Sequence, residues 1–125
     1  WSGLKARPIF QPAVGSYDQG MLVMIPLQGS NGAELHQALA AYYQGEQFVQ
    51  VQPYNEIAAD TAPFITPHGL SGSNRAELQV FGAANGQQAL LVAKLDNLGK
   101  GASGAAVQNL NIMLGLEEGL CTQIG

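Results

Sequence analysis

The stretch that decides the fold is DNLGKGASGAAVQN, residues 96–109. It follows the apolar run ALLVA at residues 89–93, which is typical of a strand, and it opens a second apolar run at residues 105–116 that has the length of a helix. A strand, a glycine-rich turn and a helix start, in this order, can present backbone N–H groups to an anion. The same order also suits a tight strand-to-helix connection packed through small residues. The residues alone leave both interpretations open.

The turn contains the groups that a binding site for an anion would use. Glycine allows positive φ and a close approach of the backbone, a lysine adds a cation, and short polar side chains add hydrogen-bonding groups. These groups are the glycines Gly99, Gly101 and Gly104, the cation Lys100, and the polar side chains of Asn97 and Ser103. The spacing does not match the G-x-G-x-x-G fingerprint of dinucleotide-binding folds, which also requires a complete strand–helix–strand unit.

Outward from this turn, hydrophobic patterning predicts the remaining elements. The predicted strands are residues 8–12, 20–27, 48–52, 77–81 and 88–94, and the predicted helices are residues 33–44 and a helix that starts at 101 or 102 and ends at 114. Residues 53–72 are predicted to form a long loop with one short helical turn at 55–60. The order strand, strand, helix, strand, loop, strand, strand, helix predicts an α+β domain with a mixed, largely antiparallel sheet and helices on one face.

Local signals fix several boundaries. Ser30 or Asn31 can cap the first helix, with Glu34 in its first turn. Pro26 removes a backbone donor, so its strand is predicted at an edge or a bulge of the sheet. Asn85 followed by Gly86 predicts a hairpin.

Composition limits the function classes. The 125 residues suit one domain, and 46% hydrophobic residues indicate a globular fold. Charged residues make up only 11%, and the apolar runs are not polar on one side, so we expect the second face of the sheet to be an interface. Five Lys and Arg residues and a net charge of −4 argue against nucleic-acid binding. Apolar runs are too short to span a membrane, and the single cysteine favours a cytoplasmic protein.

The side chains that could act as nucleophile, acid or base are few. Cys121 has no histidine near it in the sequence, and we expect it to be unreactive. His36 is expected to be a solvated residue of the first helix. His68 is the only plausible acid or base, although the sequence around it favours a structural loop histidine. The adjacent Glu117 and Glu118 do not face one another on a helix, and no spacing of ligands predicts a metal site.

Three segments together resemble N-acetyl-gamma-glutamyl-phosphate reductases. The first is residues 96–109, which resemble the signature near the carboxyl end of that family. Residues 12–21, PAVGSYDQGM, resemble the segment before a central strand, and residues 70–75, LSGSNR, resemble its Gly-Ser/Thr-Asn loop. The resemblance covers nearly the whole chain.

The resemblance implies a fold and a reaction. It implies the carboxyl-terminal domain shared with glyceraldehyde-3-phosphate and aspartate-semialdehyde dehydrogenases, here residues 1–125, whose open sheet face makes a homodimer or homotetramer. The family reduces N-acetyl-glutamyl 5-phosphate to the semialdehyde with NADPH, in arginine biosynthesis. A cysteine thiolate attacks the acyl phosphate, and a histidine handles the proton. The resemblance also implies candidate residues near the nicotinamide of NADP, namely Asn97, Lys100, Gly101, Ala102, Ser103 and Gly104.

Several features depart from the family pattern. The catalytic cysteine and histidine of the family match no residue here, so we expect a fragment without its nucleotide-binding domain that is inactive alone. Gln19 stands where many relatives have an arginine, which puts phosphate binding there in doubt. Two alternatives stay open: a domain of a semialdehyde dehydrogenase acting on aspartyl or aminoadipyl phosphate, and a non-catalytic oligomerisation or binding module.

Overall fold

The computed structural model describes Gly3, Lys5 and residues 7–57 and 64–122. The elements follow one another as β1 Met21–Gln28, α1 Gly32–Tyr42, β2 Val49–Val51, β3 Asn55–Ile57, β4 Ala76–Ala83, β5 Gln88–Leu95, the π-helix η1 Gly99–Ser103 and α2 Gly104–Leu114.

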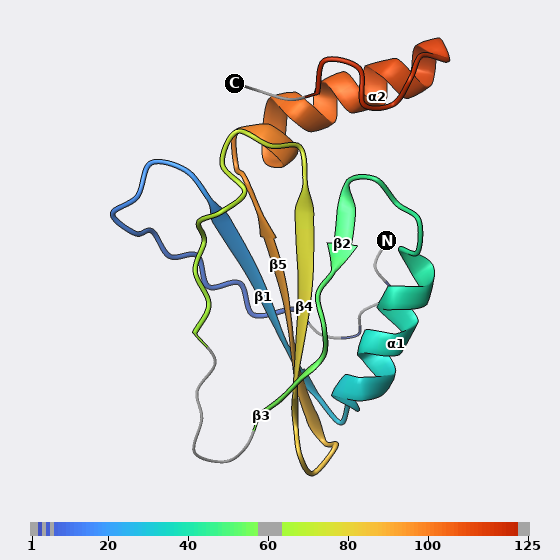
Figure 1. Cartoon of the computed structure of the whole chain (residues 1–125). Coiled ribbons are helices and arrows are strands. Elements are labelled where there is room, and N and C mark those ends of the chain that lie inside the picture. Colours follow the sequence, from blue (N-terminus) through green and yellow to red (C-terminus); the bar gives the residue numbers. More distant parts are fainter. Residues whose placement is uncertain (1–2, 4, 6, 58–63, 123–125) are drawn as a thin grey trace.

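One mixed sheet organises the molecule (Figure 1). Its strands lie in the order β1-β5-β4-β2, and β3 pairs with β4 beyond β2. The long strands β1, β5 and β4 are antiparallel neighbours, whereas the short strands β2 and β3 run parallel to β4. The predicted α+β class with a mixed, largely antiparallel sheet is therefore confirmed.

The edge strand and the hairpin follow their sequence signals. Pro26 lies in β1, which pairs only with β5 among the described strands, so the missing N–H falls at an edge as predicted. The hairpin between β4 and β5 turns at Gly86, whose φ is +67°, and the Gly86 N–H donates to the carbonyl of Ala83 at 2.9 Å. Glycine adopts this left-handed conformation without the steric penalty of other residues.

Helix α1 begins at a side-chain cap and approaches the sheet closely. The Asn31 Oδ1 accepts the N–H groups of Ala33 at 3.0 Å and Glu34 at 3.4 Å, which decides between the two predicted caps. A Cβ atom on Gly32 would lie 2.7 Å from the Cα of Gly82 in β4, so glycine allows helix and strand to touch. Helix α1 thereby covers the β4–β2 half of one sheet face.

Helix α2 does not lie on that face. It extends across the end of the sheet and contacts mainly η1 (Figure 1). The α-helix starts at Gly104 rather than at 101 or 102, because residues 99–103 form the wider π-helical turn. It ends as predicted at Gly115, which caps it in the left-handed conformation with φ of +69°.

Two predicted segments are wrong. Residues 8–12 form no strand, and Ile9 and Phe10 are 95% and 87% exposed. Two prolines leave this segment short of the donors that a strand needs. Asn55–Ile57 form the strand β3 and not a helical turn, because β4 offers an unpaired edge beyond β2. Residues 58–60, the remainder of that predicted turn, lie outside the described residues.

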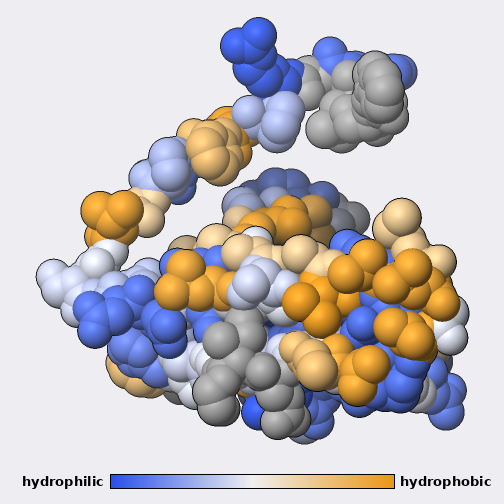
Figure 2. All heavy atoms as spheres, turned by 90° about the horizontal axis from the view of Figure 1, so that it is seen from above, coloured by the Kyte–Doolittle hydropathy of each residue, from blue (hydrophilic) through white to orange (hydrophobic). Residues whose placement is uncertain are grey.

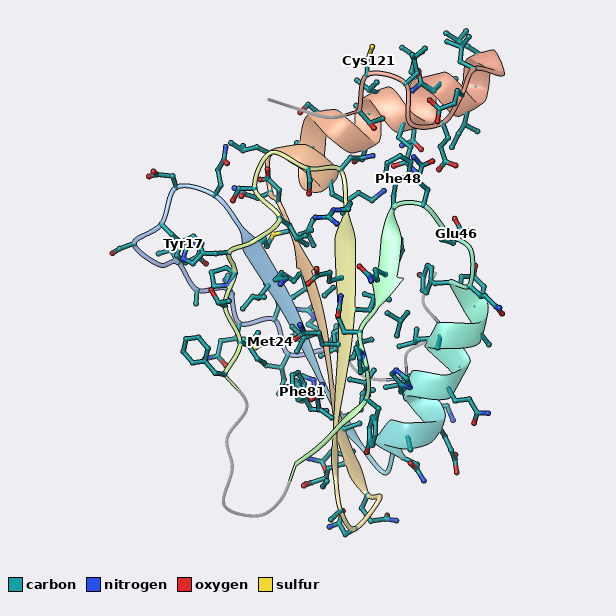
Figure 3. All side chains as sticks on the ribbon, in the orientation of Figure 1. Tyr17, Met24, Glu46, Phe48, Phe81 and Cys121 are labelled. Carbon is teal, nitrogen blue, oxygen red and sulfur yellow. The ribbon has the colours of Figure 1, made fainter. Side chains whose placement is uncertain are left out.

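The sheet face opposite α1 is partly open. Directly paired residues of antiparallel strands lie on the same face, so Pro26, Leu90 and Phe81 share the face away from Gly82. They line a hollow of about 500 Å³ at one end of the sheet. Met24, two residues before Pro26 in β1, lies on the same face and is 57% exposed (Figure 3).

A second apolar surface lies on α2 and the turn that follows. Figure 2, which looks down on this end of the molecule, shows hydrophobic side chains gathered there. Each of the following is at least 46% exposed: Leu110, Ile112, Met113, Leu114, Leu116 and Leu120. No helix in the described part of the chain is long and apolar enough to cross a membrane.

Candidate functional site

The glycine-rich turn uses its own backbone donors. The N–H of Gly101 donates to the carbonyl of Asp96 at 2.8 Å, and the N–H of Ser103 donates to the carbonyl of Leu98 at 3.1 Å. The N–H of Gly104 closes the same pattern on the carbonyl of Gly99. Each bond spans five residues, which defines a π-helical turn. These three N–H groups are therefore engaged inside the turn and are not presented to an anion.

Asp96 fastens this turn to a distant loop. Its carboxylate is 1% exposed and accepts the N–H of Gly72 at 2.7 Å and the N–H of Leu98 at 2.9 Å. The bond from Leu98, with further backbone bonds from Gly72 and Gly99, lowers the pKa of Asp96 against the opposing effect of burial. The sequence analysis missed this role. The signal was an aspartate at a strand end, where its side chain bonds the N–H two residues on.

Asn97 ties the turn to the start of β1. Its Oδ1 accepts the N–H of Gly20 at 2.8 Å. Gly20 has a φ of +115°, and a Cβ atom there would collide with the carbonyl oxygen of Pro67. The turn, the segment before β1 and the loop that contains His68 therefore meet at one end of the sheet.

Lys100 points inward. Its Nζ donates to the Oε1 of Gln108 at 2.6 Å and lies 5.4 Å from the centre of the Phe48 ring. Desolvation lowers the pKa of Lys100, and the nearby charge of Glu118 acts in the opposite direction. The lysine predicted as a ligand-facing cation is thus a half-buried structural cation.

Gln108 is the centre of this polar cluster, which sequence reasoning also missed. Besides Lys100, its Oε1 accepts the Asn74 Nδ2 at 2.9 Å, and its Nε2 donates to the Glu118 Oε1 at 2.6 Å. Asn74 is 2% exposed, and its Oδ1 has no hydrogen-bond partner among the described residues. A Cβ atom on Gly104 would lie 2.6 Å from that oxygen, so the loop and the helix start require glycine at this position.

The remaining predicted residues form an exposed shoulder. Gly101, Ala102 and Ser103 are exposed, and the Ser103 hydroxyl donates to the carbonyl of Leu98 at 2.8 Å. Because the N–H groups of Gly101 and Ser103 and the Ser103 hydroxyl are already bonded, this shoulder offers mainly small side chains for packing. The half-buried Asn97 lies beside it, with its amide nitrogen as the remaining donor of that side chain.

The other candidate groups lie apart. His36 is half-buried, and its Nε2 lies 2.9 Å from the carbonyl oxygen of Gln52, so the expectation of a solvated histidine is wrong. His68 is exposed and meets the ring of Tyr17 edge-on at 5.5 Å. Cys121 is exposed at the far side of α2, well away from Tyr17 (Figure 3).

No covalent chemistry is assembled by these groups. Within residues 7–57 and 64–122, no three His, Cys, Asp or Glu side chains are grouped so that they could hold a metal ion. The described cysteine and the histidine that packs on Tyr17 lie on different parts of the molecule. The arrangement can position backbone and pack against a ligand or another domain, but it does not pair a nucleophile with a base.

Comparison with known proteins gives a consistent result. The family profile described as semialdehyde dehydrogenase, dimerisation domain, matches residues 1–97. An N-acetyl-gamma-glutamyl-phosphate reductase of Nostoc sp. is 55% identical over 95% of this chain, and the corresponding reductase of Trichormus variabilis is 53% identical over the same share. The reductase of Burkholderia cenocepacia is 48% identical over 91% of the chain. The chain spans 39%, 39% and 38% of the length of these three relatives. The resemblance drawn from residues 12–21, 70–75 and 96–109 is confirmed.

Proposed function

The chain belongs to the semialdehyde dehydrogenase dimerisation domain family, and on that premise we propose that it is the carboxyl-terminal domain of an NADPH-dependent N-acetyl-gamma-glutamyl-phosphate reductase. The full-length protein would reduce N-acetyl-glutamyl 5-phosphate to N-acetyl-glutamate 5-semialdehyde in arginine biosynthesis, in the cytoplasm. The observation that carries the proposal is 55% identity to such a reductase along 95% of the chain.

In this proposal the turn at residues 97–104 forms one wall of the nicotinamide site. NADPH supplies the hydride when it is bound. Gly101 and Ala102 pack against the uncharged end of the cofactor, because both are exposed and small. Asn97 donates from its amide nitrogen, since its oxygen is held by Gly20. Lys100, Ser103 and Gly104 act by shaping the turn, because Ser103 and Gly104 are bonded within it and the Lys100 Nζ is bonded to Gln108.

The reactive groups would come from outside this domain. The described residues pair no thiol with a histidine, so the domain supplies shape, cofactor contacts and self-association rather than the nucleophile. A dimerisation domain supports self-association, and we propose the open sheet face around Met24 as the contact in a homodimer or homotetramer. Met24 lies on the face that α1 leaves uncovered and is 57% exposed.

A direct assay tests this function. The full-length protein that contains this chain is supplied with NADPH and N-acetyl-glutamyl phosphate, and semialdehyde formation is followed. The same assay is repeated with aspartyl phosphate or aminoadipyl phosphate as the substrate, and with NADH in place of NADPH. Turnover limited to N-acetyl-glutamyl phosphate and NADPH is the expected result. Turnover of aspartyl or aminoadipyl phosphate alone would show that the protein is a related semialdehyde dehydrogenase. The absence of all turnover would favour the alternative of a non-catalytic binding module.

The wall of the cofactor site is tested by substitution in the same protein. Asn97→Asp and Ala102→Trp should raise the KM for NADPH, because the first removes the amide donor but keeps the acceptor of the Gly20 N–H, and the second fills the shoulder. Ala106→Ser, at an exposed position one turn further along α2, is the control. An unchanged KM for NADPH in both variants would show that the turn is only a structural connection between β5 and α2.

A further inference from the structure

We propose that Gln108 is a positioning residue for this site: its carboxamide fixes Lys100 and thereby the shape of the turn whose exposed residues 101–103 face the cofactor. The inference rests on the proposed function and deepens it. It concerns a residue on α2 that makes no contact with the shoulder surface itself.

The geometry around Gln108 uses both ends of its side chain. The oxygen accepts from the Lys100 Nζ at 2.6 Å and the Asn74 Nδ2 at 2.9 Å, and the nitrogen donates to Glu118 at 2.6 Å. A carboxamide oxygen has two lone pairs, so two donors saturate it. One side chain thus joins the loop before β4, the turn η1, helix α2 and the turn that follows α2.

The bonding pattern requires glutamine. Glutamate keeps the acceptor toward Lys100 but cannot donate to Glu118, and two carboxylates at hydrogen-bond distance repel each other. Asparagine has the same two groups on a stem shorter by one methylene, so it cannot reach three partners fixed by three separate segments.

Lys100 depends on this arrangement. Its ammonium is held between the Gln108 oxygen and the face of Phe48, with Glu118 as the nearby negative charge. The other carboxylate of that turn, Glu117, accepts the N–H of Gly119 at 2.8 Å. Without the Gln108 oxygen, the half-buried cation loses its only close acceptor among the described residues and regains hydration by turning outward.

An outward turn of Lys100 would move the shoulder. Lys100 lies inside η1, directly before Gly101 and Ala102, so a change of its side-chain direction acts on the backbone that we assign to the cofactor. Asn74 would lose its acceptor at the same time, and its Oδ1 is already unpartnered among the described residues. The loop and the turn would then be held together mainly by Asp96 and Gly72.

The test exchanges the carboxamide of Gln108 and the carboxylate of Glu118 in the full-length protein. Gln108→Glu should raise the KM for NADPH about tenfold, with a smaller change in kcat, because repulsion by Glu118 moves the new carboxylate away from Lys100 and that hydrogen bond to a charged group is lost. Adding Glu118→Gln restores the bond with reversed direction and should recover most of the KM. Glu118→Gln alone removes the charge but keeps an acceptor for the Gln108 Nε2, and Gln37→Glu on the exposed surface of α1 adds a charge away from the contact.

Four results would overturn the proposal, two of them from experiments that replace the first one. One is an unchanged KM in Gln108→Glu, and another is a double variant as impaired as the single one. If Gln108→Glu fails to fold, Gln108→Asn replaces it, and an unchanged KM there has the same meaning.

If the wild type reduces no acyl phosphate, the proposed function fails. The positioning role of Gln108 is then tested by amide hydrogen exchange at residues 99–103. Exchange should be faster in the Gln108 variant than in the wild type, and equal rates would overturn this role.

Discussion

The N–H of Gly72 donates to the carboxylate of Asp96 at 2.7 Å, although the two residues are 24 positions apart in the chain. This bond joins the loop before β4 to the turn after β5, and both segments lie beside the start of α2. A carboxylate that is 1% exposed is retained here because backbone N–H groups solvate it in place of water. The candidate site is therefore built on a buried charge held by the main chain.

Replacing this carboxylate should destabilise the domain. Asp96→Asn keeps one acceptor oxygen but places an NH₂ group against a backbone donor, so one buried N–H loses its partner. We expect a loss of about 1–3 kcal/mol in the free energy of unfolding, measured by urea denaturation. Asp18→Asn is the matched control, because Asp18 is exposed. Equal stability of the two variants would contradict the role given to Asp96.

The same carboxylate should make stability depend on pH. Because the pKa of Asp96 is lowered from its ordinary value of 3.8 in the folded chain, the unfolded chain binds this proton more tightly. The stabilisation is complete above that ordinary value and is lost as the pH falls through the folded pKa. The difference in unfolding free energy between wild type and Asp96→Asn should therefore shrink in acid. A difference that stays constant down to about pH 2 would exclude Asp96 as the titrating group.

Close packing at the turn should make two glycines irreplaceable. A methyl group at Gly99 would collide with the carbonyl oxygen of Ser73, and one at Gly104 would lie 2.6 Å from the Asn74 Oδ1. Each change to alanine should lower the free energy of unfolding by about 1–3 kcal/mol, although alanine is the better helix former. Thermal denaturation measures the loss. A stabilising effect of Gly104→Ala would show that the loop and α2 do not pack as described.

Helix α1 should depend on its cap. Asn31→Ala removes the acceptor of the N–H groups of Ala33 and Glu34 and should cost about 1 kcal/mol. Asn31→Asp retains that acceptor and should be close to wild type. Ser30→Ala serves as the control, since the other predicted cap residue is not used. An equal loss in Ser30→Ala and Asn31→Ala would contradict the assigned cap.

The open sheet face should control self-association. Met24→Lys places a charge in the centre of the proposed contact and should weaken association by at least about tenfold, because an unpaired charge at an interface must be desolvated. Sedimentation equilibrium of the full-length protein measures the effect. Gln87→Lys, on the exposed hairpin turn, is the control. Association that survives Met24→Lys unchanged would place the interface elsewhere, with the apolar surface of α2 as the next candidate.

Local patterns predicted most of the fold because local physics produces it. Asn85 and Gly86 specify a hairpin whatever surrounds them, and Pro26 excludes a central strand. The failures concern segments whose structure depends on partners. Residues 8–12 have strand-like composition, but two prolines leave them short of the donors that a strand needs, and Asn55–Ile57 became a strand because β4 had a free edge.

The candidate site divides in the same way. By itself, the sequence determined that residues 96–109 are a strand end, a glycine-rich turn and a helix start, and it determined the family, because both depend on residue types and their spacing along the chain. Only the tertiary structure decided what each residue does. Lys100 was expected to face a ligand, yet it turns inward because Gln108, Phe48 and Glu118 meet there from three other segments. Hydrogen-bond partners far apart in the chain decide where a charge lies, and spacing along the sequence does not contain that information.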